Sequence, residues 1–228
     1  MRRFYKDVVL GDDFSVLLDG KPLQTPARAT LVLPTRALAE AVAAEWRGQG
    51  DKIEPTAMLL TKLANTAIDR AGALRGEIEA ELLGFGGSDL ICYFAAWPEA
   101  LVARQQAAWL PLHDWLHQAH GVRLKTTAGV SHVAQDPAAL AALARLLAAQ
   151  DRWTLTGLQT ATALTGSLVL ALALAEGRLA PADAFALARL DETFQAEQWG
   201  ADAAAEKRSA GHARELEMTG EFMALART

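Results

Sequence analysis

Cysteine is almost absent from this chain of 228 residues: Cys92 is the only one, so no internal disulfide can form and a reducing compartment is favoured. Positive charge is also in short supply. Lys and Arg number 22 against 27 Asp and Glu, which gives a formal net charge of -5. Because a protein that binds nucleic acid by neutralising phosphates is normally basic, this class of function is disfavoured.

Long hydrophobic runs are absent too. The most apolar window, residues 158–175, is interrupted by Gln, Thr, Gly and Ser, and a bilayer would leave these polar side chains unsatisfied. We therefore expect a buried core helix there and no membrane span. The N-terminal sequence MRRFYKDVVLGDDF has two arginines with no long apolar stretch after them, so neither a secretory signal nor a transit segment is expected.

Common catalytic motifs are missing. The chain contains no G-x-x-x-x-G-K-[ST], H-E-x-x-H or G-x-S-x-G, which are the signatures of a phosphate-binding loop, a zinc protease and a serine hydrolase. The GFGG segment at 84–87 lacks the third glycine of a dinucleotide-binding loop and follows a predicted helix, whereas that loop follows a strand.

What the sequence does contain is apolar and helix-forming. Hydrophobic residues make up 51% and charged residues 21%, so the chain can bury a sizeable core and is not disordered. Alanine, the strongest helix former, occupies 48 positions. A largely helical body is therefore expected.

In the N-terminal part, the apolar residues follow a strand pattern and not the helical pattern of the rest of the chain. Short β-branched and aromatic runs at 6–10, 14–18 and 30–33 predict strands, and the Asp19-Gly20 pair between the second run and Lys21 predicts a tight hairpin turn. From Pro34 the pattern changes. Leu38, Val42 and Trp46 recur every four residues, which predicts a helix over 36–47.

Helical patterns dominate the remainder. One runs from Ala57 until Gly84, Gly86 and Gly87, and residues 122–133 read as a short strand or an extended loop. The fold class is predicted to be α+β: a small N-terminal α/β domain with antiparallel strands (1–56, with a boundary that could extend to about 90), then a larger all-α domain (57–228). Further helices are predicted at 99–119, 137–149, 154–175, 181–198 and 202–225.

Three histidines form the most suggestive cluster for chemistry. His113, His117 and His120 would share one face of a helix, where they could converge on a metal with Asp114 as a supporting partner. A partly solvated helix face is the alternative. Cys92 could be a nucleophile if the fold brings a histidine to it, but its apolar neighbours describe a small buried residue. Ser167, in Thr-Gly-Ser, is read as a close helix-packing position.

Acidic residues accumulate at the C-terminal end. Residues 176–228 contain ten Asp or Glu and six Lys or Arg, whereas residues 1–56 contain eight of each kind. Asp191 and Glu192 point about 100° apart on a helix, so they are poorly placed as a catalytic pair. One suits attachment to a neighbouring helix and the other suits a partner. The polar and aromatic set Asp191, Glu192, Gln195, Gln198 and Trp199 is typical either of a solvated face or of a protein-binding surface.

Taken together, eight segments resemble one family: the assembly chaperones of the ATP synthase catalytic sector that protect the free α subunit. The resemblance spans nearly the whole chain. The segments are RRFYKDV (2–8), LDGKPLQTPA (18–27), LVLPTRALAEAVAAEWRGQ (31–49), I-x-P-x-x-MLLTKLANTAIDR (53–70), SDLICYF (88–94), Q-x-x-WLPLHDW (106–115), TGSLVLALAL (165–174) and LDETFQAEQWGAD (190–202).

This resemblance implies a chaperone that is not an enzyme and needs no cofactor, metal or small-molecule substrate. It would bind the unassembled α subunit and prevent its aggregation until the β subunit replaces it. By motif match, Glu192 is the first choice and Asp191 the second for the family's important acidic position. The resemblance implies structural roles for Trp46, which would anchor its helix on the sheet, and for Pro55 and Asp69.

Two departures from the family pattern affect the partner surface: Arg47 stands where an acidic residue often occurs, and Phe194 replaces a more usual tryptophan. Composition favours a cytoplasmic bacterial protein, with the mitochondrial matrix as the location of a processed eukaryotic form. Two other functions stay open. One is a metal-dependent hydrolase that uses His113, His117 and His120. The other is an adaptor with the same fold and a different protein client.

Overall fold

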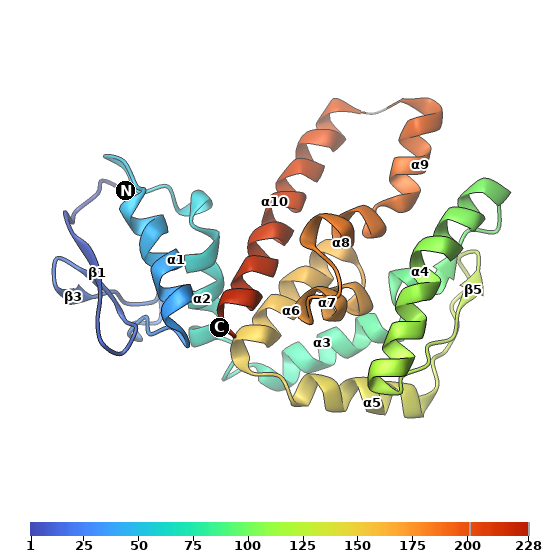
Figure 1. Ribbon diagram of the computed structural model, residues 1–228, viewed down its shortest axis with the longest axis horizontal. Coiled ribbons are helices and arrows are strands. Elements are labelled where there is room, and N and C mark those ends of the chain that lie inside the picture. Colours follow the sequence, from blue (N-terminus) through green and yellow to red (C-terminus); the bar gives the residue numbers. More distant parts are fainter. Residues whose placement is uncertain (201, 228) are drawn as a thin grey trace. The chain divides into compact units, whose positions relative to one another are not determined.

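The Asp19-Gly20 turn forms the hairpin that the sequence predicts. In the computed structural model, which describes residues 1–200 and 202–227, both residues have positive φ, 49° and 78°, as a two-residue hairpin turn requires. The strands β1 (Val8–Leu10), β2 (Val16–Leu18) and β3 (Lys21–Pro22) form an antiparallel sheet in the order β1-β2-β3 (Figure 1). The Asp19 carboxylate accepts hydrogen bonds from the backbone N–H groups of Lys6 and Asp7 and thereby holds the chain that enters β1.

The prediction of a strand over residues 30–33 is wrong. Thr30 and Val32 form only isolated bridges, with Gln24 and Ser15 respectively. The tight turn before them, in which Arg28 has a φ of 65°, and Pro34 after them leave too few residues in register for a continuous ladder.

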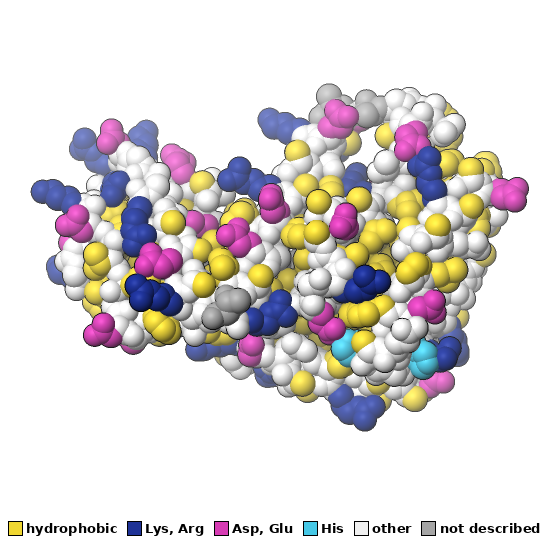
Figure 2. All heavy atoms as spheres, in the orientation of Figure 1, with side chains coloured by type: hydrophobic (Ala, Val, Ile, Leu, Met, Phe, Trp, Pro, Cys, Tyr) yellow, Lys and Arg dark blue, Asp and Glu magenta, His cyan; other side chains and the backbone are white. Residues whose placement is uncertain are grey.

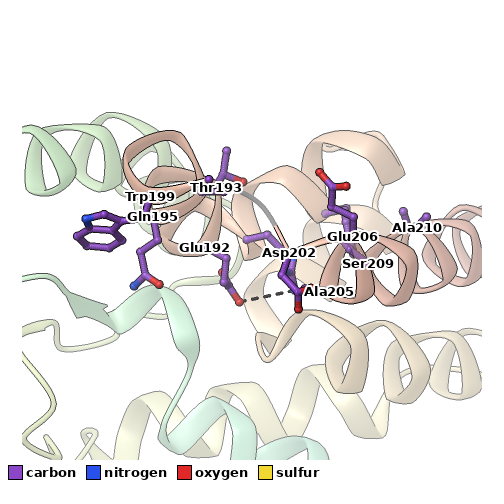
Figure 3. Close-up of a pocket in the computed structure, with 14 residues that line it drawn as sticks. Glu192, Thr193, Gln195, Trp199, Asp202, Ala205, Glu206, Ser209 and Ala210 are labelled. Carbon is purple, nitrogen blue, oxygen red and sulfur yellow. Dashed lines mark ion pairs between the residues drawn. The ribbon is translucent and has the colours of Figure 1, made fainter.

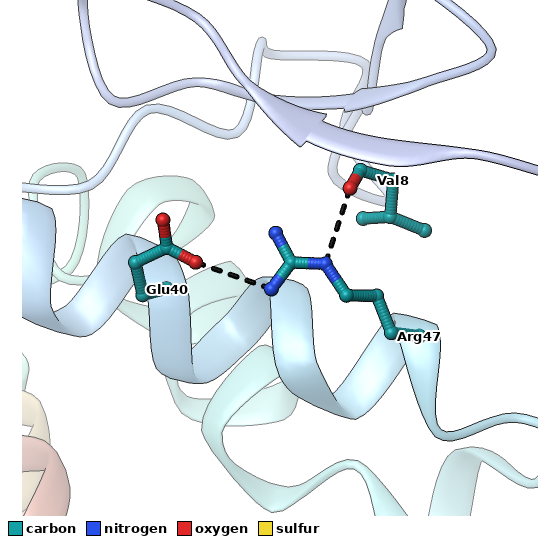
Figure 4. Close-up of polar contacts among 3 residues, drawn as sticks. All are labelled: Val8, Glu40 and Arg47. Carbon is teal, nitrogen blue, oxygen red and sulfur yellow. Dashed lines mark hydrogen bonds and ion pairs between the residues drawn. The ribbon is translucent and has the colours of Figure 1, made fainter.

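Helix α1 (Arg36–Arg47) has the predicted bounds and packs on this sheet. Thr35 caps it by accepting a hydrogen bond from the Leu38 N–H, and its buried face includes Leu38 and Val42. Arg47 ties the end of the helix to the sheet. Its Nε donates to the Val8 carbonyl oxygen at 3.1 Å, and its guanidinium also contacts Glu40 at 3.1 Å (Figure 4).

The long helix predicted from Ala57 is two helices. After a 3-10 turn, η1 (Pro55–Ala57), come α2 (Leu59–Asp69) and α3 (Arg75–Gly87). Asp69, the last residue of α2, accepts hydrogen bonds from Thr25 Oγ1 (2.5 Å) and the Ala27 N–H (3.0 Å), so its side chain holds the loop that follows β3.

The remainder is mostly helical. The extended-segment prediction at 122–133 is confirmed by β5 (Thr127–Ala128), which pairs in parallel with β4 (Tyr93–Phe94) after the 3-10 turn η2 (Leu90–Cys92). The helices are α4 (Glu99–His120), α5 (Pro137–Ala148), α6 (Arg152–Thr165), α7 (Leu168–Ala175), α8 (Pro181–Ala188), α9 (Leu190–Trp199) and α10 (Ala203–Leu225).

Two of these pairs, α6/α7 and α8/α9, were each predicted as one helix. The first break lies at Gly166, whose φ of 71° a helix cannot contain. The second lies at Arg189, whose φ of -111° and ψ of 22° end α8, although no glycine or proline marks the position. The expectation of a core helix in the most apolar window is met by α7, in which all eight residues are buried.

The described chain forms two compact units. One contains Met1–Arg75, Asp151–Gly157 and the residues from Met218 onward, and the other contains Gly76–Gln150 and Leu158–Glu217. The predicted fold class, α+β with a small antiparallel sheet followed by a mostly helical region, is confirmed. The domain boundary placed at residue 56, or as far as about 90, stays a prediction. Among residues 1–200 and 202–227, no helix is both long and apolar enough to cross a bilayer.

Candidate functional site

Helix α9 carries the residues that the sequence singles out, and its inner face is fixed to α4. Phe194 is buried, and the Arg104 guanidinium lies 5.2 Å from the centre of its ring. Asp191 Oδ1 accepts a hydrogen bond of 2.6 Å from Gln105 Nε2, while Gln105 Oε1 accepts one of 2.6 Å from the Ala95 N–H. Gln105 is fully buried and Asp191 is half-buried, so these hydrogen bonds attach α9 to a buried side chain of α4.

An ion pair holds the other end of the same helix. Arg104 and Glu197 make two contacts, at 2.8 and 2.9 Å, with both side chains about half exposed. The hydrogen bond from Arg104 and its positive charge lower the pKa of Glu197. Phe194, Asp191 and Glu197 together define the face of α9 that contacts α4.

The other face of α9 is exposed. The Glu192 side chain is 52% exposed and lies 3.6 Å from the guanidinium of Arg189, three residues earlier at the break before α9. Trp199 is 80% exposed. Gln195 and Gln198 are also exposed, but only Gln195 lies in the hollow described next. The two adjacent carboxylates thus have different surroundings: Asp191 is hydrogen-bonded to Gln105 of α4, and Glu192 is exposed.

A hollow of about 690 Å³ lies between α9 and α10, and we call it the α9–α10 hollow (Figure 3). Small residues, Ala196, Ala205, Ala210 and Ala213, give it room, and Phe185 of α8 adds an aromatic side chain. In the space-filling view, hydrophobic side chains are exposed among charged ones over α8 and between α9 and α10 (Figure 2). The remaining residues that line the α9–α10 hollow are Arg189, Glu192, Thr193, Gln195, Trp199, Gly200, Asp202, Glu206 and Ser209.

The three histidines of α4 do not converge. His113 Nε2 lies 2.9 Å from the Ile91 carbonyl oxygen, His117 Nε2 accepts from the Arg123 guanidinium at 2.7 Å, and His120 Nε2 lies 2.8 Å from Glu176 Oε1. Each imidazole therefore has a different partner. In the part of the chain that the structure describes, no group of three or more His, Cys, Asp or Glu side chains is arranged to hold a metal.

Cys92 and Ser167 occupy structural positions. The Cys92 side chain is completely buried, and burial together with the nearby Asp89 charge raises the pKa of its thiol well above the ordinary value. Ser167 begins α7: its Oγ accepts from the Leu170 N–H at 3.0 Å and donates to Asp89 Oδ1 at 2.6 Å. Neither contact resembles the pairing of a nucleophile with a general base.

Asp89 is the main residue that sequence reasoning missed. It is fully buried, and its carboxylate accepts hydrogen bonds from Ser167 Oγ, the Val169 N–H and the Ile91 N–H. One side chain therefore caps both α7 and η2. The signal was available, since an Asp directly before an apolar run is typical of a helix N-cap, but the partner segment lies some eighty positions later.

Three residues expected to be structural lie in the other unit. The Trp46 ring packs against Tyr5, with ring centres 5.6 Å apart, and the Tyr5 hydroxyl donates to the Trp46 carbonyl oxygen. Pro55 opens η1, and Asp69 makes the two hydrogen bonds described above. Nearby Glu45, which the sequence did not single out, caps α2 by accepting from the Leu60 and Thr61 N–H groups at 2.8 Å each.

Comparison with known proteins connects this geometry to one family. The family model described as ATP12 chaperone protein matches residues 2–117. The crystal structure of Atp12 from Paracoccus denitrificans is 41% identical over 99% of this chain and 98% of its own, with a TM-score of 0.93. A point mutant of the same Paracoccus protein has a TM-score of 0.95 at the same identity and coverage. A candidate chaperone from Agrobacterium tumefaciens is 44% identical over 98% of this chain and 85% of its own, with a TM-score of 0.91.

Proposed function

The chain belongs to the ATP12 chaperone family, and from this premise we propose that its client is the unassembled α subunit of the ATP synthase catalytic sector. On this proposal, the protein covers the surface of α that later faces the β subunit and so prevents aggregation. Exposed apolar surface on an orphan subunit drives self-association, and a stoichiometric binder lowers the concentration of the free species. The β subunit then displaces the chaperone because it forms the more extensive interface.

The observation that carries the proposal is the two-sided character of α9. One face is held against α4 by Asp191, Phe194 and Glu197. The opposite face presents an exposed carboxylate at Glu192 and an exposed aromatic ring at Trp199. Aromatic residues with polar neighbours are the usual anchors of specific protein interfaces.

Within this surface we assign different tasks to the predicted residues. Glu192, Gln195 and Trp199 contact the client, and Gln198 lies at the edge of the contact. Asp191 acts through α9, because its carboxylate is bonded to Gln105 and positions the helix. The proposal also places the protein in the cytoplasm of a bacterium, which is supported by its similarity to proteins of two bacteria.

The test uses purified α subunit of the source organism. The parent protein should suppress the light scattering of aggregating α at stoichiometric amounts, and Glu192→Lys should bind α at least about tenfold more weakly. Glu217→Lys is the matched control because it makes the same charge change on α10 outside the α9–α10 hollow. Far-UV circular dichroism verifies that both variants fold.

Each result decides one statement. If the parent neither binds α nor suppresses its aggregation, the proposed client is wrong, and a pull-down from the source cell that recovers another dominant protein would favour the adaptor function. If the parent binds α and Glu192→Lys binds it equally well, the assignment of Glu192 is wrong while the client stands.

A further inference from the structure

We propose that the α9–α10 hollow binds an amphipathic helix of the client that carries Lys or Arg beside its apolar face. This inference rests on the proposed function, and it adds the chemistry and the secondary structure of the segment that is recognised. Three observations support it. The lining residues recur at helical spacing along α9 and α10, carboxylates outnumber cations around the hollow, and most of the lining backbone is already hydrogen-bonded within helices.

The lining residues lie on one face of each helix. On α9 they include Glu192, Gln195, Ala196 and Trp199, which follow the spacing i, i+3, i+4, i+7. On α10 they include positions 205, 206, 209, 210 and 213, which also recur at three- and four-residue intervals. A helix that packs against another helix presents this pattern. Here residues of two helices line the same hollow.

The side chains leave room for a backbone to approach. Four of the lining residues are alanines and one, Gly200, has no side chain, whereas Phe185 and Trp199 are large and apolar. The distance between packed helices depends on the side chains at the contact, so the alanines that line the hollow permit another helix to approach closely. The Arg189 guanidinium lies 5.9 Å from the centre of the Phe185 ring, and the exposed Trp199 ring is available to an apolar anchor of the incoming segment.

Charge around the hollow is predominantly negative. Glu192, Asp202 and Glu206 contribute three carboxylates, and Arg189 is the cation among the lining residues. Arg189 already faces Glu192 at 3.6 Å, and Asp202 accepts a hydrogen bond from the Ala204 N–H. Lys207 and Arg208 follow Glu206 on α10 but do not line the hollow. A segment with Lys or Arg would complement this charge, and an acidic segment would be repelled.

The backbone of the hollow favours a helix over a strand. Strand addition needs a row of unpaired N–H and C=O groups, whereas most of the lining here belongs to helices whose backbone groups are bonded internally. The hollow is also open to solvent, whereas a site for a small molecule usually encloses most of its ligand. Docking of a helix in a groove is the recognition mode that uses both properties.

The test compares variants that fill the hollow with one that does not. Ala205→Trp and Ala210→Trp place an indole inside it, and Ala204→Trp places the same group on an exposed position of α10 outside it. The two filling variants should bind purified α subunit at least about tenfold more weakly, and Ala204→Trp should bind as the parent does. Glu206→Lys, an exposed change that keeps the hollow open, should weaken binding as well.

A second measurement identifies the segment. Overlapping peptides of about 20 residues that cover the α subunit are titrated into the parent protein. The bound peptides should carry Lys or Arg, gain helical circular dichroism on binding, and lose affinity when NaCl is raised from about 0.05 to about 0.5 M. Bound peptides that are acidic or remain extended would overturn the inference.

The outcomes separate this inference from the proposed function. If the parent does not bind α, the proposed client and this inference both fail. If the parent binds α and the filled and charge-reversed variants bind it equally well, the hollow is not the docking site, although the client stands. If filling the hollow changes only the oligomeric state of the free protein, its occupant is a second copy of this chain and the inference is overturned.

Discussion

Replacing Asp89 by alanine should destabilise the compact unit that contains Gly76–Gln150 and Leu158–Glu217 far more than an ordinary cap substitution does. The change removes an acceptor from three donors: Ser167 Oγ at 2.6 Å, the Val169 N–H at 3.0 Å and the Ile91 N–H at 3.3 Å. Each hydrogen bond to a charged group contributes about 1.5–3 kcal/mol, and a buried donor left unpaired costs about 1–3 kcal/mol. Removal of the buried charge offsets part of this loss. We expect a net loss of about 3–5 kcal/mol.

The structure provides a matched control at Asp136. This residue caps α5 with one hydrogen bond, to the Ala138 N–H at 2.8 Å, but it is exposed. Asp136→Ala should therefore cost only about 1 kcal/mol, as surface caps do. Both residues lie in the same compact unit, so urea unfolding followed by circular dichroism monitors the same transition. If the two variants lost equal stability, the argument that burial makes the Asp89 cap costly to remove would be refuted.

The same site predicts a pH dependence. Burial raises the pKa of Asp89 above its ordinary value, although its three hydrogen bonds and the nearby His113 oppose that shift. Between the ordinary pKa and the raised one, the folded state therefore holds a proton that the unfolded state has already lost, whereas above the raised pKa the buried carboxylate is charged. Stability of the parent should fall, relative to Asp89→Asn, as pH rises from about 4 towards the raised pKa. Urea midpoints of the two proteins across pH would check the sign, and a parent that gains stability relative to Asp89→Asn with rising pH would contradict it.

The remaining predictions concern Glu45, Cys92 and Arg104. Glu45→Ala should cost about 2 kcal/mol and speed amide hydrogen exchange at the start of α2, because its carboxylate accepts from two backbone N–H groups there. Cys92 should not react with a thiol reagent at pH 8 until urea unfolds the chain, because burial raises its pKa, and fast labelling of native protein would disprove this. Arg104→Gln should raise the pKa of Glu197 in an NMR titration, since Arg104 lowers it; an unchanged value would mean that the ion pair does not persist in solution.

Much of the local structure follows from the sequence because its causes are local. Asp19-Gly20 predicts the hairpin, since both turn residues must adopt positive φ. Thr35 and the four-residue spacing of Leu38 and Val42 predict α1, since capping and amphipathicity involve only neighbours along the chain. Even the different orientation of Asp191 and Glu192 follows from helix geometry. The break at Arg189 has no such local cause, and the sequence did not predict it.

Contacts between distant segments decided the rest. Asp89 reads as a cap from its own neighbours, but only the tertiary structure brings Ser167 and Val169 to the same carboxylate. The histidines share a helix, yet packing gives each a different partner, so the predicted convergence does not occur. The α9–α10 hollow likewise exists only because two helices approach without filling the space between them. Periodicity shows which face of a helix is apolar, whereas which segment covers that face depends on contacts that no spacing along the chain encodes.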